Sequence, residues 1–196
     1  MRMPPASGRD NRPAAWQNAP MHQLLLMRHA KADRDDRGVA DRDRVLTARG
    51  REAAMAMRRA MRELGLAPDL VLVSPSRRTK ETLAALEPWD DMPLIDEVDR
   101  LYLASATQLA AALREISETV RSILMIGHNP GLHELAIRLA SPTMASPPKA
   151  LARLAEGFPT AALAEYAVAG PWWSLGAGSG QLLRFLAPRD LAEPAA

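Results

Sequence analysis

Three short apolar runs along the chain each end abruptly beside a cationic or imidazole side chain. The runs cover residues 23–27, 70–73 and 122–126. Apolar runs of about four to eight residues without helical spacing are typical of buried parallel strands. Arg28 and His29 follow the first run, Arg77 and Arg78 lie just beyond the second, and His128 follows the third. Because open parallel sheets bind ligands beyond the carboxyl ends of their strands, we expect these side chains to meet at one edge.

Helical and strand patterns alternate over the rest of the chain. The spacing of apolar residues predicts helices over about 48–64, 77–86, 106–116, 130–140 and 150–155. Thr47, Ser76 and Asn129 are residue types that cap helices and precede three of them. Three further strands are predicted over 93–95, 161–168 and 181–186. The alternation indicates an α/β fold of three layers, with a mainly parallel central sheet flanked by helices.

The length of 196 residues fits a single domain with short tails. We expect a disordered N-terminal tail over 1–20, because this stretch holds four prolines and no periodic pattern. The domain is then predicted over 21–190, and a frayed C-terminal tail over 191–196. Met21 directly precedes the first predicted strand, so the sequence leaves open whether translation starts at Met1 or at Met21.

Composition and charge remove several classes of function. The chain has no cysteine, which excludes disulfides and thiol catalysis and fits the cytoplasm, where we expect the protein. A formal net charge of +2 does not indicate nucleic-acid binding. No apolar run reaches the ~18 residues of a membrane helix, and the first 20 residues lack the apolar core of a secretory signal. We therefore expect neither nucleic acid nor a membrane as a partner.

Two guanidinium groups and two imidazoles at one edge suit phosphoryl transfer. A guanidinium grips a phosphoryl group with two parallel hydrogen bonds, and a neutral histidine is a competent nucleophile. A second, protonated histidine could donate to the equatorial oxygens, and a helix opened by Asn129 and Pro130 would add amide donors. Phosphoryl transfer asks a protein mainly for positioning and electrostatic stabilisation. The set predicts a two-step reaction without metal or cofactor, in which one histidine takes the phosphoryl group and water removes it.

The same residues resemble the motifs of a known family. Arg28-His29-Ala30 resembles the Arg-His-Gly signature of the histidine phosphatase superfamily, also called phosphoglycerate-mutase-like. Residues 74–82 resemble its Ser-Pro-x-x-Arg-Ala-x-Gln-Thr segment, and residues 127–131 resemble its second-histidine motif. The short chain, with residues 46–50 and a late Trp-Trp turn at 172–173, is most similar to the SixA-type phosphohistidine phosphatase branch. The resemblance covers about residues 22–190.

This resemblance implies a fold and a role for each site residue. The fold would be phosphoglycerate-mutase-like. His29 would be the phosphorylated nucleophile, Arg28 and Arg78 would bind the phosphoryl group of the substrate, and His128 would complete the pocket. The second motif assigns the arginine to Arg78 rather than Arg77. Ala30 stands where the superfamily signature has Gly, which is a mild change.

The general acid is the role that no motif assigns. Phosphomonoesterases of the superfamily usually have a carboxylic acid that protonates the leaving oxygen. Glu97 and Asp99 are candidates, with Asp96 beside them, but no surrounding pattern selects one. An imidazole leaving group needs less help than an alkoxide, so a missing acid would favour phosphohistidine over sugar phosphates.

We therefore expect a phosphatase that acts on phosphohistidine in a protein, such as a histidine phosphotransfer domain. Two alternatives stay open. One is a phosphomonoesterase that acts on a small phosphorylated metabolite at the same site. The other is a phosphate-binding module without turnover. The polar loop over 32–44, rich in Asp and Arg, is either solvated or overhangs the site and helps to select the substrate.

Overall fold

The structure is a computed structural model that describes residues 21–33, 38–141 and 146–191. The predicted N-terminal tail over 1–20 lies outside the described residues, and so does the predicted C-terminal tail apart from Leu191. Among the helices that the structure describes, none combines the length and the apolar character needed to cross a bilayer.

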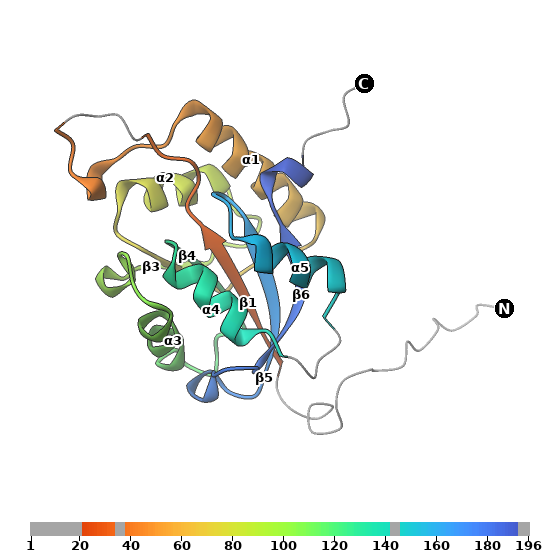
Figure 1. Cartoon of the computed structure of the whole chain (residues 1–196). Helices are drawn as coiled ribbons and strands as arrows, with labels where there is room; N and C mark the ends of the chain where they lie inside the picture. The colour runs from red at the N-terminus through yellow and green to blue at the C-terminus, as the bar shows by residue number, and fades with distance from the viewer. Residues whose placement is uncertain (1–20, 34–37, 142–145, 192–196) are drawn as a thin grey trace.

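Six strands of the described chain form one sheet in the order β3-β2-β4-β1-β5-β6. The strands are β1 Met21–Arg28, β2 Leu70–Val73, β3 Leu94–Glu97, β4 Ser122–Gly127, β5 Leu163–Ala169 and β6 Gly180–Leu186. Strands β3, β2, β4 and β1 are parallel, whereas β5 pairs antiparallel with β1 and β6 antiparallel with β5. The predicted α/β fold with a mainly parallel sheet is confirmed (Figure 1).

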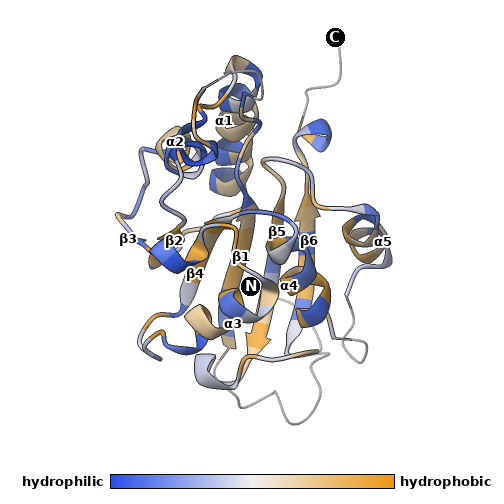
Figure 2. Cartoon of the chain, turned by 60° about the vertical axis from the view of Figure 1, so that its left-hand side comes forward, coloured by the Kyte–Doolittle hydropathy of each residue, from blue (hydrophilic) through white to orange (hydrophobic). Residues whose placement is uncertain are grey.

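Helices cover both faces of this sheet, so the molecule has three layers (Figure 1). They are α1 Ala48–Glu63, α2 Arg77–Leu86, α3 Ala106–Arg114, α4 Gly131–Leu139 and α5 Pro148–Glu156. Successive side chains of a strand point to opposite faces. Leu24 and Leu26 of β1 accordingly join the apolar cluster that includes α3 and α4, whereas Leu25 and Met27 join the cluster that includes α1. In Figure 2 the central strands are mostly coloured as hydrophobic, whereas the helices on either side carry both hydrophobic and hydrophilic residues.

Two of the predicted helix caps are confirmed and the third is wrong. The side chains of Thr47 and Ser76 accept hydrogen bonds from the third backbone amide of α1 and α2. Asn129 does not cap α4, because that helix begins at Gly131 with Pro130 as its N-cap residue. The Asn129 amide instead donates to the carbonyl oxygen of Phe158 at 3.0 Å, and so ties the exit of β4 to the segment before β5.

Candidate active site

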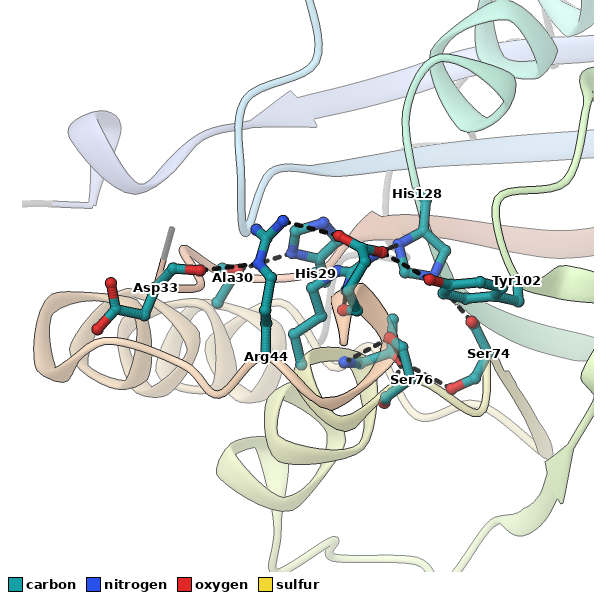
Figure 3. A network of polar contacts seen from close by, with 11 residues as sticks. His29, Ala30, Asp33, Arg44, Ser74, Ser76, Tyr102 and His128 are labelled. Carbon is teal, nitrogen blue, oxygen red and sulfur yellow. Dashed lines mark hydrogen bonds and ion pairs between the residues drawn. The ribbon is translucent and has the colours of Figure 1, made fainter. Parts of the chain in front are cut away.

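The carboxyl ends of β1, β2 and β4 deliver four side chains to one cavity of about 590 Å³. Arg28 ends β1 and His29 follows it, Arg78 lies in the first turn of α2, and His128 follows β4. All four line the cavity, and Figure 3 shows His29 and His128 lying close together in it. The structure therefore brings together the residues that the sequence pattern singled out, because three parallel strands end at the same edge of the sheet.

His29 is held as a neutral imidazole with a defined tautomer. Its Nδ1 lies 2.8 Å from the carbonyl oxygen of Ala30. Since a carbonyl oxygen only accepts, Nδ1 carries the proton and the lone pair is on Nε2. Burial, together with the positive charges of Arg78 and Arg28, lowers the pKa of His29 to about 4. At neutral pH the side chain is therefore uncharged and nucleophilic at Nε2.

His128 is also neutral, which differs from the protonated second histidine expected from the sequence. Its Nε2 lies 2.8 Å from the hydroxyl of Ser74, and its Nδ1 lies 3.4 Å from Nη2 of Arg78. Because a guanidinium only donates, Nδ1 accepts and Nε2–H donates to Ser74. Burial and the nearby His29, whose ring centroid is 5.2 Å away, lower the pKa of His128 to about 3. Ser74, which begins the second motif but was given no role from the sequence, thus fixes the tautomer of this imidazole.

The two neighbouring arginines of α2 differ sharply in their surroundings. The side chain of Arg78 is only 3% exposed and lines the cavity. The side chain of Arg77 is 59% exposed and donates to Glu81 at 2.9 Å. Arg28 also lines the cavity, and its Nη1 donates to the carbonyl oxygen of Phe158 at 2.9 Å. The structure therefore places Arg78, and not Arg77, with Arg28 at the cavity.

Asp41 is a further site residue that sequence reasoning did not single out. It lies in the 3₁₀ turn η2, Asp41–Asp43, within the polar loop, and its carboxylate lines the cavity. Oδ2 accepts from Arg78 at 3.0 Å and from the Tyr102 hydroxyl at 2.6 Å, and Oδ1 accepts from Arg44 at 2.7 Å. Figure 3 shows Arg44 and Tyr102 reaching toward the same place beside the two histidines. The part of the polar loop at Asp41 and Arg44 therefore overhangs the site.

The candidate general acids do not line the cavity in the described part of the chain. Glu97 pairs with Lys80, and Asp99 pairs with Arg42 at 3.0 Å. The cavity carboxylate is Asp41, and the hydrogen bonds from Tyr102 and Arg78 lower its pKa. Asp41 is therefore ionised at neutral pH, which makes it unsuited to protonate a leaving group while these contacts persist.

Two further cations line the cavity, and one first-turn amide of α4 is bonded within the chain. Lys31 and Arg44 line the cavity in addition to Arg28 and Arg78. The backbone amide of Leu132 donates to the carbonyl of His128, so this first-turn donor of α4 is used within the chain. The described residues contain no group of three or more His, Asp or Glu side chains that could hold a metal ion. The site is thus a pocket for an anion, built from guanidinium and imidazole groups.

The comparisons with known proteins agree with this geometry. Residues 24–101 match the sequence model of the histidine phosphatase superfamily, branch 1. An uncharacterised protein of Mycobacterium tuberculosis is 38% identical over 165 residues, which cover 83% of this chain and 100% of that protein. The chain belongs to the histidine phosphatase superfamily. The match begins at the strand that leads into Arg28 and His29.

Two solved structures place this phosphatase in the SixA-type branch. One, from Nakamurella multipartitia, bears the name of a SixA phosphohistidine phosphatase and is 27% identical, with a TM-score of 0.72 over 91% of this chain and 99% of that one. Another of the same name, from Agrobacterium tumefaciens, is also 27% identical, with a TM-score of 0.72 over 85% of this chain and 98% of that one. The predicted family, branch and phosphatase activity are confirmed.

Proposed function

We propose that this phosphatase transfers the phosphoryl group of its substrate to Nε2 of His29, and from there to water, without a metal ion. The hydrogen bond from Nδ1 of His29 to the carbonyl of Ala30 is the observation that carries the proposal, because it keeps the lone pair on Nε2. Phosphate binding alone would require the arginines but not a neutral imidazole with a fixed tautomer. The site is therefore built for a covalent step.

The reaction needs two displacements at phosphorus. In the first, Nε2 of His29 forms a bond to phosphorus while the bond to the leaving group breaks. In the second, water forms a bond to phosphorus, the bond to Nε2 breaks, a proton passes to solvent and inorganic phosphate leaves. Arg28 and Arg78 neutralise the charge on the phosphoryl oxygens in both steps. A dianion beside His128 raises the pKa of that imidazole, so His128 donates to a phosphoryl oxygen once the substrate is bound.

The preferred substrate is phosphohistidine in a protein. Among the described residues, Asp41 is the carboxylate that lines the cavity; it is ionised and bonded to Arg78, so the described lining offers no carboxylic acid that could protonate an alkoxide. The imidazole of phosphohistidine is a better leaving group, because it takes up its proton readily from water. The SixA name of the similar structures points to the same substrate class.

A labelled phosphoryl donor tests the nucleophile. We expect wild-type protein to acquire label that is lost in acid and stable in base, as is typical of phosphohistidine, and His29→Ala to acquire none. His133→Gln is the matched control, because His133 lies outside the cavity, with its Nε2 at 2.7 Å from the carbonyl of Leu154. Label that persists in His29→Ala would reject the assignment.

A substrate panel tests the leaving group. We expect hydrolysis of a phosphohistidine protein to exceed that of sugar and nucleotide monophosphates by orders of magnitude in kcat/KM, and a chelator to leave the rate unchanged. Efficient turnover of the monophosphates would instead favour the small-molecule phosphomonoesterase. Loss of activity in chelator, restored by a divalent cation, would contradict the metal-free mechanism.

A further inference from the structure

Two further hollows adjoin the active-site cavity. The second hollow, of about 480 Å³, shares Arg28 and Asn129 with the cavity. The third, of about 340 Å³, shares Lys31 and Thr160 with the cavity, and Arg189 with the second hollow. The three hollows are therefore neighbours around the segment at Pro159 and Thr160. A ligand that extends beyond the cavity on this side would meet the residues that border the other two hollows.

Positive charge is concentrated around these hollows. Among the described residues, seven Lys or Arg side chains line the three depressions, against two carboxylates, Asp41 and Glu156. The formal net charge of the whole chain is only +2. The excess of cations at this face is thus compensated by acidic residues elsewhere on the molecule.

The outer cations of this face are weakly paired. We call Arg49 and Arg189 the basic rim; both are exposed and both line the third hollow. Arg49 makes no ion pair with any residue that the structure describes. Arg189 approaches Glu156 at 3.9 Å, with both side chains largely exposed, so that pair is weak. The start of α1 carries Arg49, and the 3₁₀ turn η5, Pro188–Asp190, carries Arg189; α1 and η5 lie side by side (Figure 1).

A protein substrate must bring its own surface onto this rim. His29 is only 8% exposed, so the phosphoryl group has to enter the cavity. A phosphohistidine side chain is short, and the residues that flank it in the substrate protein therefore reach the edge of the cavity. Charge complementarity at such an edge accelerates association and selects partners.

We infer that the basic rim binds an acidic protein surface around the phosphorylated histidine of the substrate. The inference rests on the proposed function, since it specifies the partner that this site would take. The rim would raise the association rate and the affinity for the substrate protein, and it would leave the chemical step at phosphorus unchanged.

The test compares a protein substrate with a small one. Arg49→Gln combined with Arg189→Gln should lower kcat/KM about tenfold at low salt for a phosphohistidine protein with acidic residues around the histidine, mainly through KM. The loss should shrink as ionic strength rises, because exposed charges are screened. Phosphoramidate, a small phosphoryl donor, should be hydrolysed at the wild-type rate, since neither residue lines the active-site cavity.

The matched control is Arg59→Gln combined with Arg121→Gln. Arg59 lies on the same helix as Arg49 and is also exposed, and Arg121 precedes β4 at the opposite edge of the sheet; neither lines any of the three hollows. The control removes the same number of positive charges and should leave kcat/KM unchanged for the phosphohistidine protein and for phosphoramidate.

Three outcomes would overturn the inference. The first is an equal fall in kcat/KM for the phosphohistidine protein in the control variant. The second is an unchanged kcat/KM in the rim variant. The third is that the rim variant loses as much kcat/KM on a substrate protein whose acidic residues are replaced by amides as on the acidic one. A rim that bound single-stranded oligonucleotide while leaving the KM for the phosphoprotein unchanged would point to nucleic acid instead. If wild type fails to form a phosphoenzyme from phosphoramidate, the proposed function itself is wrong. This assay uses no protein substrate and no rim variant, so its result is independent of the test of the rim.

Discussion

Asp41 is hydrogen-bonded to Arg78, the guanidinium that we propose binds the phosphoryl group. Its backbone carbonyl and its Oδ2 accept from the two terminal nitrogens of Arg78, so Asp41 occupies the end of the guanidinium. The Arg78 side chain is almost fully buried, whereas that of Asp41 is 45% exposed. A phosphoryl group that binds Arg78 therefore displaces Asp41 rather than moving the arginine.

Asp41→Asn should consequently tighten the binding of inorganic phosphate by about tenfold, because phosphate then displaces a neutral amide from Arg78 instead of a carboxylate. Tyr102→Phe should tighten it by about threefold without any change in charge, since the tyrosine hydroxyl helps to hold Asp41 in place. Isothermal titration of phosphate into each variant measures both effects. Asp99→Asn, which removes a nearby exposed carboxylate, serves as the control and should change little. Weaker binding in Tyr102→Phe would show that Asp41 stays in place when phosphate binds.

The two arginines of α2 allow a second test at single residues. Arg78→Ala should lower kcat by several powers of ten, since it removes a buried guanidinium from the phosphoryl site. Arg77→Ala should leave kcat within about twofold, because it removes an exposed pair of little energetic value. Steady-state kinetics on phosphoramidate would check both, and equal losses would contradict the choice between the neighbours.

Among single residues, the sequence predicted the site residues that belong to motifs and missed Asp41, which a loop brings to the cavity. His29, Arg78 and His128 follow strand ends, where the direction of the chain fixes their position. Asp41 reaches the site through the path of a loop, which local patterns do not encode. The carboxylates near residue 97 were reasonable candidates in the sequence, but they lie on the edge strand β3 and the turn after it.

Among the elements, the first turn of α1 sets the position of the strand exit that carries His29. The amide and hydroxyl of Thr47 both donate to the carbonyl of Lys31, two residues after His29. Gly50, one turn further on, lies so close to that carbonyl that a β-carbon would come within 2.1 Å of its oxygen. A backbone carbonyl cannot yield cheaply, so only glycine fits here.

Gly50→Ala should therefore destabilise the protein by about 1–3 kcal/mol and lower activity, because α1 has to move away from the exit of β1. Urea unfolding and phosphoramidate hydrolysis would measure the two effects. Gly176→Ala is the control, because a β-carbon there meets nothing closer than 3.7 Å. A fully active and stable Gly50→Ala protein would show that the helix does not position the nucleophile.

The order of the helices and strands was readable from the sequence, whereas the pairing of the last two strands was not. Apolar runs and caps predicted α1, α2 and the strands β1, β2 and β4 within a few residues. The antiparallel addition of β5 beside β1 depends on a contact across more than 130 residues, which no local pattern specifies. The same limit explains why the hollows around Pro159 could not be predicted.

For the whole molecule, the two neutral histidines couple stability to pH. Each has a pKa in the folded state well below 6.5, at about 4 for His29 and about 3 for His128. The unfolded chain therefore binds more protons between about pH 4 and 6.5, so the free energy of unfolding rises with pH in this window and falls as the solution is acidified through 6.5.

We expect each histidine to remove about 2 kcal/mol of stability between pH 7 and pH 5. Urea unfolding at the two pH values should show a smaller drop for His29→Asn and for His128→Asn than for wild type. The comparison concerns the difference between the pH values, so it does not depend on the stability of each variant at pH 7. An unchanged drop in both variants would contradict the neutral state of the site.

The order of the sheet has a consequence for when the enzyme can first work. Strand β4 lies between β1 and β2, so His29, the proposed nucleophile, and Arg78, at the start of α2, follow strands that do not pair with each other. A growing chain that has emerged only as far as β3 possesses both groups but nothing to hold them at a common distance. Turnover should thus begin only after β4 has been inserted between them, and the catalytic rate can serve as a reporter of that assembly event.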